Sequence, residues 1–231
     1  MTVGKKYFVF GLLITIVFIA CKKDTINEPE TPEQVSASTT YPNYSNLKIG
    51  NYWIYQRFEL DGSGGETPLA IIDSCYIEKD TLINSNTYFK YVSPNFGVTI
   101  TPSNSTSFVA EFFRDSLSYI ISSTGRIEFS SQDFTTIFYS YYGIAGPNDT
   151  ICRVECQMKD QNVSVTTPAG TFVTSNFKET QYMYPNYMMN GAIKYRSRRY
   201  AENIGKVTQE WYLFAITPTR WERRLIRYHL N

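Results

Sequence analysis

Residues 162–183 read NVSVTTPAGTFVTSNFKETQYM, and this stretch decides the fold class. β-Branched and aromatic residues fill both of its halves, which favours extended backbone. The Pro168-Ala169-Gly170 segment between the halves is a turn signal. The stretch therefore predicts a hairpin of two strands, at residues 162–167 and 171–183.

The same punctuation recurs on both sides of this hairpin, where aromatic and β-branched runs end at Gly, Pro, Asn or Asp. Further strands are expected at residues 49–60, 70–79, 86–93, 117–122, 126–130, 194–201, 204–214 and 221–230. Tyr, Phe and Trp make up 16% of the chain, a composition that suits pleated, half-buried surfaces. We therefore predict a single all-β domain over residues 47–231.

The first of these strands is apolar on both faces. Trp53 and Tyr55 point one way, while Ile54 and Phe58 point the other. Because a strand with one wet face would alternate apolar and polar residues, this strand needs cover on both sides. The expected architecture is one antiparallel, strongly curved meander sheet that resembles a half-open barrel.

Two stretches compete for one short helix. Between residues 134 and 141, four apolar side chains recur at helical spacing behind Asp133, a candidate N-cap. The β-branched residues in the same stretch favour a strand instead. Residues 108–113 pose the same problem over a shorter span, and both alternatives stay open.

The N-terminus has the form of a targeting segment. Lys5 and Lys6 precede an uncharged apolar run, residues 8–20, which is shorter than the roughly 20 residues that span a bilayer. The run ends at Ala20-Cys21, which resembles the lipobox of bacterial lipoproteins. We expect residues 1–20 to be a signal peptide, Cys21 to be the lipid attachment point, and residues 21–46 to form a flexible tether. The alternatives are an uncleaved anchor and a plain secretory signal.

Charge argues against a nucleic-acid partner. The chain has 22 basic and 21 acidic residues, and removing residues 1–20 takes away two lysines, so that the mature chain is close to neutral. The positive charge is concentrated near the C-terminus, where nine basic residues between Lys194 and Asn231 face only three acidic ones.

These basic strands give the candidate ligand-binding residues. Lys194, Arg196 and Arg198 share one face of a predicted strand, and we expect Arg223 and Arg227 to share a face with Trp221. Aligned side by side, the rows would form a cationic, aromatic-lined surface for a lipid or an acidic glycan. The alternative is a solvated outer face with ordinary cross-strand ion pairs. The candidate binding residues are Arg196, Arg198, Trp221, Arg223 and Arg227.

Catalytic and metal chemistry finds little support in the sequence. His229 is the only histidine, which disfavours a triad or a zinc site, and we expect no catalytic residue, no metal and no cofactor. A glycan hydrolase would need only two carboxylates. The candidates for such a pair are Asp73, Glu78, Asp80, Glu111 and Asp115. The acidic, glycine-rich residues 61–66 lack the ligand spacing of an EF-hand, so we interpret them as a hairpin loop.

Three cysteines remain after Cys21. Cys152 and Cys156 lie four apart, about 13 Å along a strand, which is beyond the reach of a disulfide. One disulfide between Cys75 and either of them, or three buried thiols, are both open.

Four segments together resemble uncharacterised lipoproteins of Bacteroidota-type bacteria, whose domains are similar to the curved, half-open sheets of lipoprotein carriers and receptors. The segments are residues 50–55, 80–81, 168–172 and 200–207. The resemblance implies turns at Gly50, Gly170 and Gly205 and core positions at Trp53 and Phe172. It implies an envelope location, at the outer membrane on its periplasmic or surface face, and no particular activity. We therefore expect a lipid-anchored envelope protein with a non-enzymatic binding or structural role. A glycan hydrolase or a subunit of an envelope assembly is the alternative.

Overall fold

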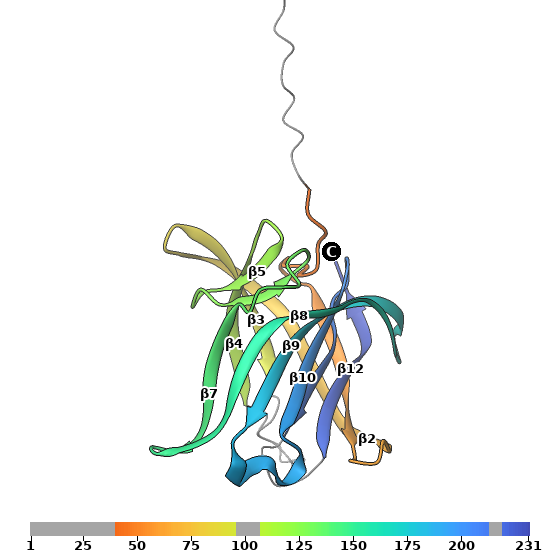
Figure 1. The fold of residues 1–231 in the computed structure, drawn as a ribbon. Coiled ribbons are helices and arrows are strands. Elements are labelled where there is room, and N and C mark those ends of the chain that lie inside the picture. The colour runs from red at the N-terminus through yellow and green to blue at the C-terminus, as the bar shows by residue number, and fades with distance from the viewer. Residues whose placement is uncertain (1–39, 96–106, 213–218) are drawn as a thin grey trace, which may run out of the picture. The chain divides into compact units, whose positions relative to one another are not determined.

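The computed structural model describes residues 40–95, 107–212 and 219–231. Within them, twelve strands form one antiparallel sheet in the order β6-β5-β4-β3-β2-β1-β12-β11-β10-β9-β8-β7. The sheet is strongly curled (Figure 1). The strands are β1 (Tyr52–Leu60), β2 (Glu66–Ile83), β3 (Asn86–Pro94), β4 (Phe108–Ser116), β5 (Tyr119–Ser122), β6 (Ile127–Ser130), β7 (Tyr139–Gly146), β8 (Asp149–Thr167), β9 (Gly170–Met183), β10 (Ile193–Ala201), β11 (Gly205–Tyr212) and β12 (Arg220–His229). The predicted all-β class and the single curved antiparallel sheet are confirmed.

The sheet consists of two meanders joined at its centre. β1 to β6 follow one another on one side and β12 back to β7 on the other, and β1 pairs with β12 from Tyr52–His229 to Leu60–Arg220. The two ends of the domain therefore meet in the middle of the sheet. β6 and β7, neighbours in sequence, are its two edges.

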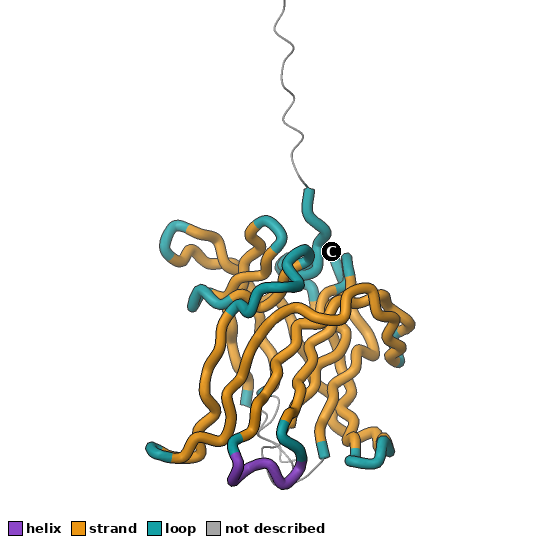
Figure 2. The backbone as a smooth tube through the Cα atoms, viewed as in Figure 1, coloured by secondary structure: helices purple, strands orange, loops and turns teal. Residues whose placement is uncertain are grey.

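Neither stretch that competed for a helix forms one. Residues 108–113 lie in β4, and residues 134–138 are an irregular segment before β7. The carboxylate of Asp133 accepts the backbone N–H groups of Thr135 and Thr136, and this local turn replaces a helical first turn. The short helix is a 3-10 turn, η1 (Pro185–Asn190), which connects β9 to β10 (Figure 2). Within the described segments, no helix is both long and apolar enough to cross a bilayer.

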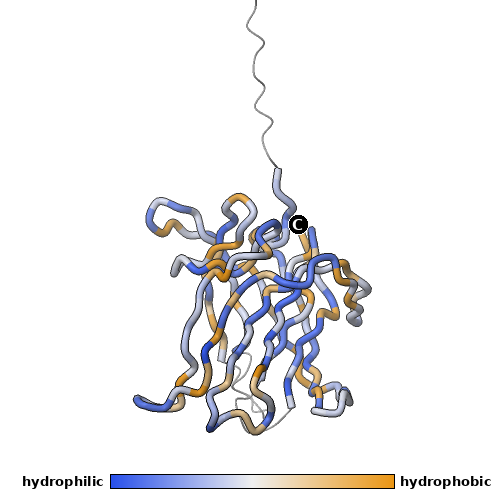
Figure 3. Tube along the Cα trace, viewed as in Figure 1, coloured by the Kyte–Doolittle hydropathy of each residue, from blue (hydrophilic) through white to orange (hydrophobic). Residues whose placement is uncertain are grey.

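Curling brings distant strands together over two apolar clusters. Figure 3 shows hydrophobic and hydrophilic residues interspersed along the strands. The first cluster packs Phe129 of β6 against Tyr200 of β10, with ring centroids 4.7 Å apart, and also includes the buried Phe177. The second is built around Trp53 and Tyr55 of β1. Because β6 meets β9 and β10 across the inside of the curl, the interior is enclosed by both halves of the sheet.

Two glycines show why the backbone follows this path. Gly50 and Gly205 have φ values of +88° and +100°, as expected for turn positions. A Cβ atom on Gly205 would lie 3.3 Å from Nε1 of Trp53, which donates a hydrogen bond to the carbonyl of Ile204 at 2.7 Å. The indole of Trp53 thus packs directly against the backbone of Gly205, which has no side chain to displace it. Trp53 is buried, as expected for a core position.

Folded contacts begin before Leu47. Ser45 is buried and donates a hydrogen bond to the Asp115 carboxylate at 2.6 Å, and the carbonyl of Asn43 accepts the N–H of Asn203 at 2.7 Å. The domain therefore includes the last residues of the segment predicted as a tether. The predicted signal peptide, Cys21 and tether residues 21–39 lie outside the described residues.

The three cysteines of the domain are free and buried. Cys75 belongs to the second cluster, whereas Cys152 and Cys156 belong to the first. Burial raises the pKa of Cys156 to about 12, so its thiol stays protonated. Of the two open alternatives, three buried thiols are correct.

A buried ion pair spans β1 and β2. The Arg57 guanidinium donates to both oxygens of the Asp73 carboxylate, each at 2.8 Å, and both side chains are almost fully buried. The exposed pair Lys90–Glu78, at 2.6 Å, offers a comparison in the same half of the sheet.

Replacing Asp73 with Ala is expected to lower the free energy of unfolding by about 3–5 kcal/mol, because it leaves a buried guanidinium without its counter-charge. Glu78→Ala, which breaks the exposed pair, is expected to cost less than about 1 kcal/mol. Urea unfolding followed by tryptophan fluorescence measures both values. Equal losses in the two variants would contradict the distinction.

Candidate functional site

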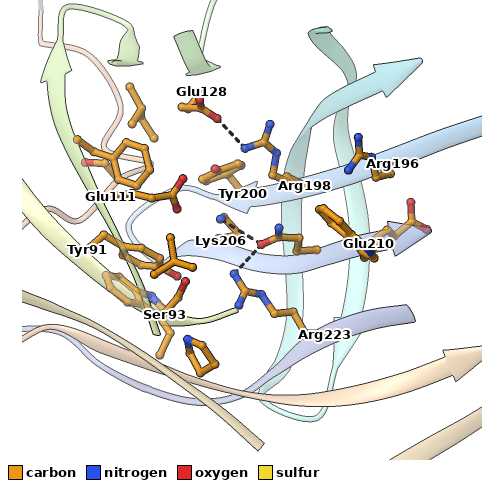
Figure 4. A pocket seen from close by; sticks show the side chains of 18 of the residues that line it. Tyr91, Ser93, Glu111, Glu128, Arg196, Arg198, Tyr200, Lys206, Glu210 and Arg223 are labelled. Carbon is orange, nitrogen blue, oxygen red and sulfur yellow. Dashed lines mark hydrogen bonds and ion pairs between the residues drawn. The ribbon is translucent and has the colours of Figure 1, made fainter. Parts of the chain in front are cut away.

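The inside of the curl contains a cavity of about 280 Å³ (Figure 4). Its wall draws on strands from both meanders, including β3 and β4 on one side and β9 to β12 on the other. Aromatic and aliphatic residues supply the apolar part of the lining: Leu47, Trp53, Tyr91, Pro94, Val109, Phe113, Ile120, Tyr200 and Trp211. The charged part comprises Glu111, Glu128, Glu179, Glu210, Arg196, Arg198, Lys206 and Arg223.

Three of the five candidate ligand-binding residues line this cavity: Arg196, Arg198 and Arg223. The predicted shared face of Lys194, Arg196 and Arg198 is turned inward, since Lys194 and Arg196 are both buried. These residues therefore do not lie on a solvated outer face, which was the alternative to a binding surface.

The other two candidates lie elsewhere. Trp221 is buried but is not part of the cavity wall, and Arg227 is exposed. The expectation that Arg223 and Arg227 share a face is wrong, because the β1–β12 register skips one residue between the pairs Tyr55–Leu225 and Ile54–Arg227. This bulge turns Arg227 to the opposite side of the strand from Arg223.

One half of the cavity holds an internally paired network. Glu179 forms ion pairs with Arg196 at 2.8 Å and Arg198 at 3.1 Å, and Glu128 of β6 reaches Arg198 at 2.6 Å. Arg196 also donates to the hydroxyl of Tyr141 at 2.9 Å. Although burial opposes its charge, Glu128 and Glu179 raise the pKa of the Arg198 guanidinium, which therefore stays protonated.

The other half brings two cations to one neutral acceptor. Lys206 Nζ and an Arg223 nitrogen donate to the same Gln209 Oε1, at 3.3 Å and 2.6 Å. Figure 4 shows both side chains directed into the cavity. Two unit charges that share one acceptor repel each other by a few kcal/mol at an effective dielectric constant of about 20.

This environment makes Lys206 the most perturbed base of the site. Burial, followed by the charges of Arg223 and Arg198, lowers the pKa of Lys206 to about 7. Protein surrounds the ammonium group, yet the cavity leaves part of its surface accessible. Near neutral pH the site can therefore hold this amine in either protonation state.

The carboxylates weighed for a hydrolase do not come together. Asp73 is occupied by Arg57, Glu78 pairs with Lys90, and Asp80 is exposed. Burial raises the pKa of Asp115, which accepts a hydrogen bond from Ser45 and does not line the large cavity. Of the five, only Glu111 reaches the cavity wall.

The two remaining motifs have structural roles. Asp61 accepts the backbone N–H groups of Ser63 and Gly65, at 2.8 Å and 2.7 Å, within the turn between β1 and β2, as interpreted from the sequence. His229 is exposed and stacks on Tyr52. Over the segments that the structure describes, no group of three metal-ligating side chains is gathered.

The sequence predictions missed Lys206, Gln209 and the role of Glu179. Lys206 was counted among the basic residues, but nothing in its neighbourhood separates it from a solvated lysine. Its position across from Tyr200 in the β10–β11 register places it in the cavity, and that register follows from a bulge between Arg199 and Tyr200. Simple alternation along that strand would have put Lys206 and Gln209 on opposite faces, so the sequence pattern contained no signal that could have joined them.

The unfolding free energy of the wild type is expected to rise relative to that of Lys206→Met between pH 7 and pH 10. The unfolded lysine, with a pKa near 10.4, binds a proton that the folded one has lost above pH 7, so stability increases with pH across that window. The upper bound is about 5 kcal/mol, since one pKa unit corresponds to about 1.4 kcal/mol, and partial accessibility reduces it. Urea titrations at several pH values measure the difference, and parallel curves would contradict it.

Comparisons with known proteins add two structural likenesses. No family model matches the chain, and no curated protein does. One solved structure is a Bacteroides fragilis protein inferred to be exported, with a YmcC-like fold. It has a TM-score of 0.48 and 15% identity, over 81% of this chain and 99% of that one. Another is a Parabacteroides distasonis protein inferred to be a lipoprotein, with a TM-score of 0.42 and 15% identity, over 83% of this chain and all of the other.

Proposed function

We propose that this chain is a non-enzymatic binding protein of the bacterial cell envelope that holds one small organic molecule inside its curled sheet. The observation that carries the proposal is the cavity between the two meanders, which is lined both by aromatic rings and by a network of ion pairs. Such a combination of apolar walls and a few fixed polar groups is typical of small-molecule sites.

The size of the cavity limits the ligand. Small-molecule pockets span roughly 300–1,000 Å³, and the cavity, at about 280 Å³, is just below the lower end of this range. This volume favours a compact molecule, such as a single sugar acid or an aromatic acid, over a lipid with two acyl chains.

The charged network supports binding over catalysis. Glu128 is engaged in an ion pair with Arg198, and Glu179 is engaged in ion pairs with both Arg196 and Arg198. The same ion pairs fix the side chains that line the cavity, so that little ordering is left to occur when a ligand enters.

Val109→Trp is expected to lower ligand affinity at least tenfold, equivalent to about 1.4 kcal/mol, because Val109 lines the cavity and an indole there would fill it. Val163 has the same exposed fraction, 38%, but lies outside the cavity wall, so Val163→Trp is the matched control. The measurement is a thermal-shift screen of small organic acids, sugars and neutral aromatics on the mature chain in detergent, followed by titration of each hit.

Equal affinities in the two tryptophan variants would contradict a ligand in this cavity. Turnover of a hit by the wild type, abolished by Glu111→Gln, would contradict the non-enzymatic assignment and favour a hydrolase.

The envelope location depends on Cys21. Protein from its native host is expected to begin at Cys21 and to carry fatty acid on that sulfur, and Cys21→Ser is expected to leave the membrane fraction. Intact-mass measurement and membrane fractionation test this. An unprocessed N-terminus without acyl groups would contradict the anchor, irrespective of whether the cavity binds a ligand.

A further inference from the structure

The charges that line the cavity are divided unequally between its two halves. Arg196 and Arg198 face Glu128 and Glu179, whereas Lys206 and Arg223 face the neutral amide of Gln209. Glu210 also lines the cavity, but its carboxylate forms an ion pair at 3.4 Å with Arg220, which is not part of the wall. With Lys206 protonated, the half near Gln209 therefore carries two positive charges, and Glu111 is the remaining carboxylate of the wall.

Lys206 has hydrogen-bonding capacity to spare. An ammonium group carries three donors, and within residues 40–95, 107–212 and 219–231 the hydrogen-bond acceptor of Lys206 is Gln209 alone. In the same part of the chain, no carboxylate lies within ion-pair distance of its nitrogen, although the ammonium also faces the rings of Tyr91 and Tyr200. Up to two donors can thus point to a molecule in the cavity.

Gln209 is oriented by its two cationic neighbours. Because both Lys206 and Arg223 donate to its oxygen, its amide nitrogen is turned away from them. That nitrogen makes no hydrogen bond to another described residue and is a further donor at the cavity wall. The half of the cavity near Gln209 therefore presents hydrogen-bond donors and positive charge, which is the chemistry that recognises an oxyanion.

We propose that Lys206, Gln209 and Arg223 form an oxyanion subsite that takes the carboxylate of a small organic acid. This inference rests on the proposed function, and it adds the chemical class of the ligand and the place where its charge lies. A carboxylate can accept the spare donors of Lys206 and of the Gln209 amide, and the Glu111 carboxylate that faces Lys206 disfavours a second negative charge, which favours a monoanion over a phosphate dianion. The body of the acid would lie against Trp53, Tyr91 and Trp211, which line the same cavity.

Binding at this subsite couples to protonation of Lys206. The charged and titratable groups that face Lys206 come from every neighbouring strand: Tyr55 on β1, Cys75 on β2, Tyr91 on β3, Glu111 on β4, Arg198 and Tyr200 on β10, and Arg223 on β12. Burial raises the pKa of each of the three tyrosines, so they stay neutral near pH 7. Since an anion favours the charged amine, affinity should fall as pH rises above 7, where Lys206 loses its proton.

The test uses benzoate, its neutral isostere benzamide, and inorganic phosphate on the mature chain in detergent. Binding is followed by the fluorescence of Trp53 and Trp211, which line the cavity. For the wild type, benzoate is expected to bind at least tenfold more tightly than benzamide at pH 6.5. Its dissociation constant is expected to rise up to about tenfold per pH unit above pH 7, because carboxyl groups stay ionised throughout this range.

Two variants remove the subsite in different ways. Lys206→Met deletes the ammonium, and Gln209→Glu supplies a fixed carboxylate that occupies both cations without changing side-chain shape. Each is expected to weaken benzoate binding at least tenfold and to leave benzamide unchanged, and Lys206→Met should also abolish the pH dependence. Lys178→Met is the matched control, because Lys178 is a half-buried strand lysine beside a tyrosine ring, outside the cavity wall.

Unchanged benzoate binding in both variants would overturn the subsite while the proposed function stands, provided that Val109→Trp still weakens binding. The absence of binding by benzoate, benzamide and phosphate alike overturns the subsite, and the broader ligand screen then decides the proposed function separately. Phosphate that displaces benzoate and is lost in the same two variants supports the oxyanion subsite but assigns it to a phosphorylated ligand.

Discussion

The pairing of β1 with β12 is the constraint on which the rest of the structure depends. It joins the two ends of the domain in the centre of the sheet, so that two meanders become one continuous surface that can curl. Most strand pairs in the sheet are local hairpins, whereas this pair closes a separation of well over one hundred residues. The bulge in its register decides which side chains of β12 face inward: Arg223 and Leu225 do, and Arg227 does not.

Curling gives the sheet an unusual interior for a β domain. Aromatic clusters at β1 and at β8 to β10 exclude solvent, and between them lie arginines that a flat sheet would have left on a wet face. These charges are tolerated because partners from distant strands meet them, as Glu128 of β6 meets Arg198 of β10. Buried ion pairs of this kind add little net stability but are costly to break, so they act mainly to hold the two halves in one arrangement.

The proposed binding role rests on one interior cation, Lys206, whose surroundings differ from those of the paired arginines. Three arginines of the interior, Arg57, Arg196 and Arg198, have carboxylate partners on neighbouring strands, but Lys206 faces Gln209 and a second cation. A fold that neutralises most of its interior charge and leaves one amine beside a cavity has placed a polar group where a ligand can use it. The aromatic rings that line the same cavity supply the rest of a small-molecule site.

Local pattern in the sequence determined the all-β class and most of the strands with their turns, because alternation and turn residues act over a few neighbours. It left β4 open between helix and strand, and it did not predict β7 or the first part of β8. It also determined that Lys194, Arg196 and Arg198 share a face, since they lie two apart on an unbroken strand. Only the tertiary structure decided that this face is the inner one, that Arg227 turns away, and that Lys206, Gln209 and Glu179 belong to the site. Those outcomes depend on bulges and on pairings between strands far apart in the chain. A short stretch of residues does not determine the register of such a long-range pairing, because the free energy of the register depends on both strands.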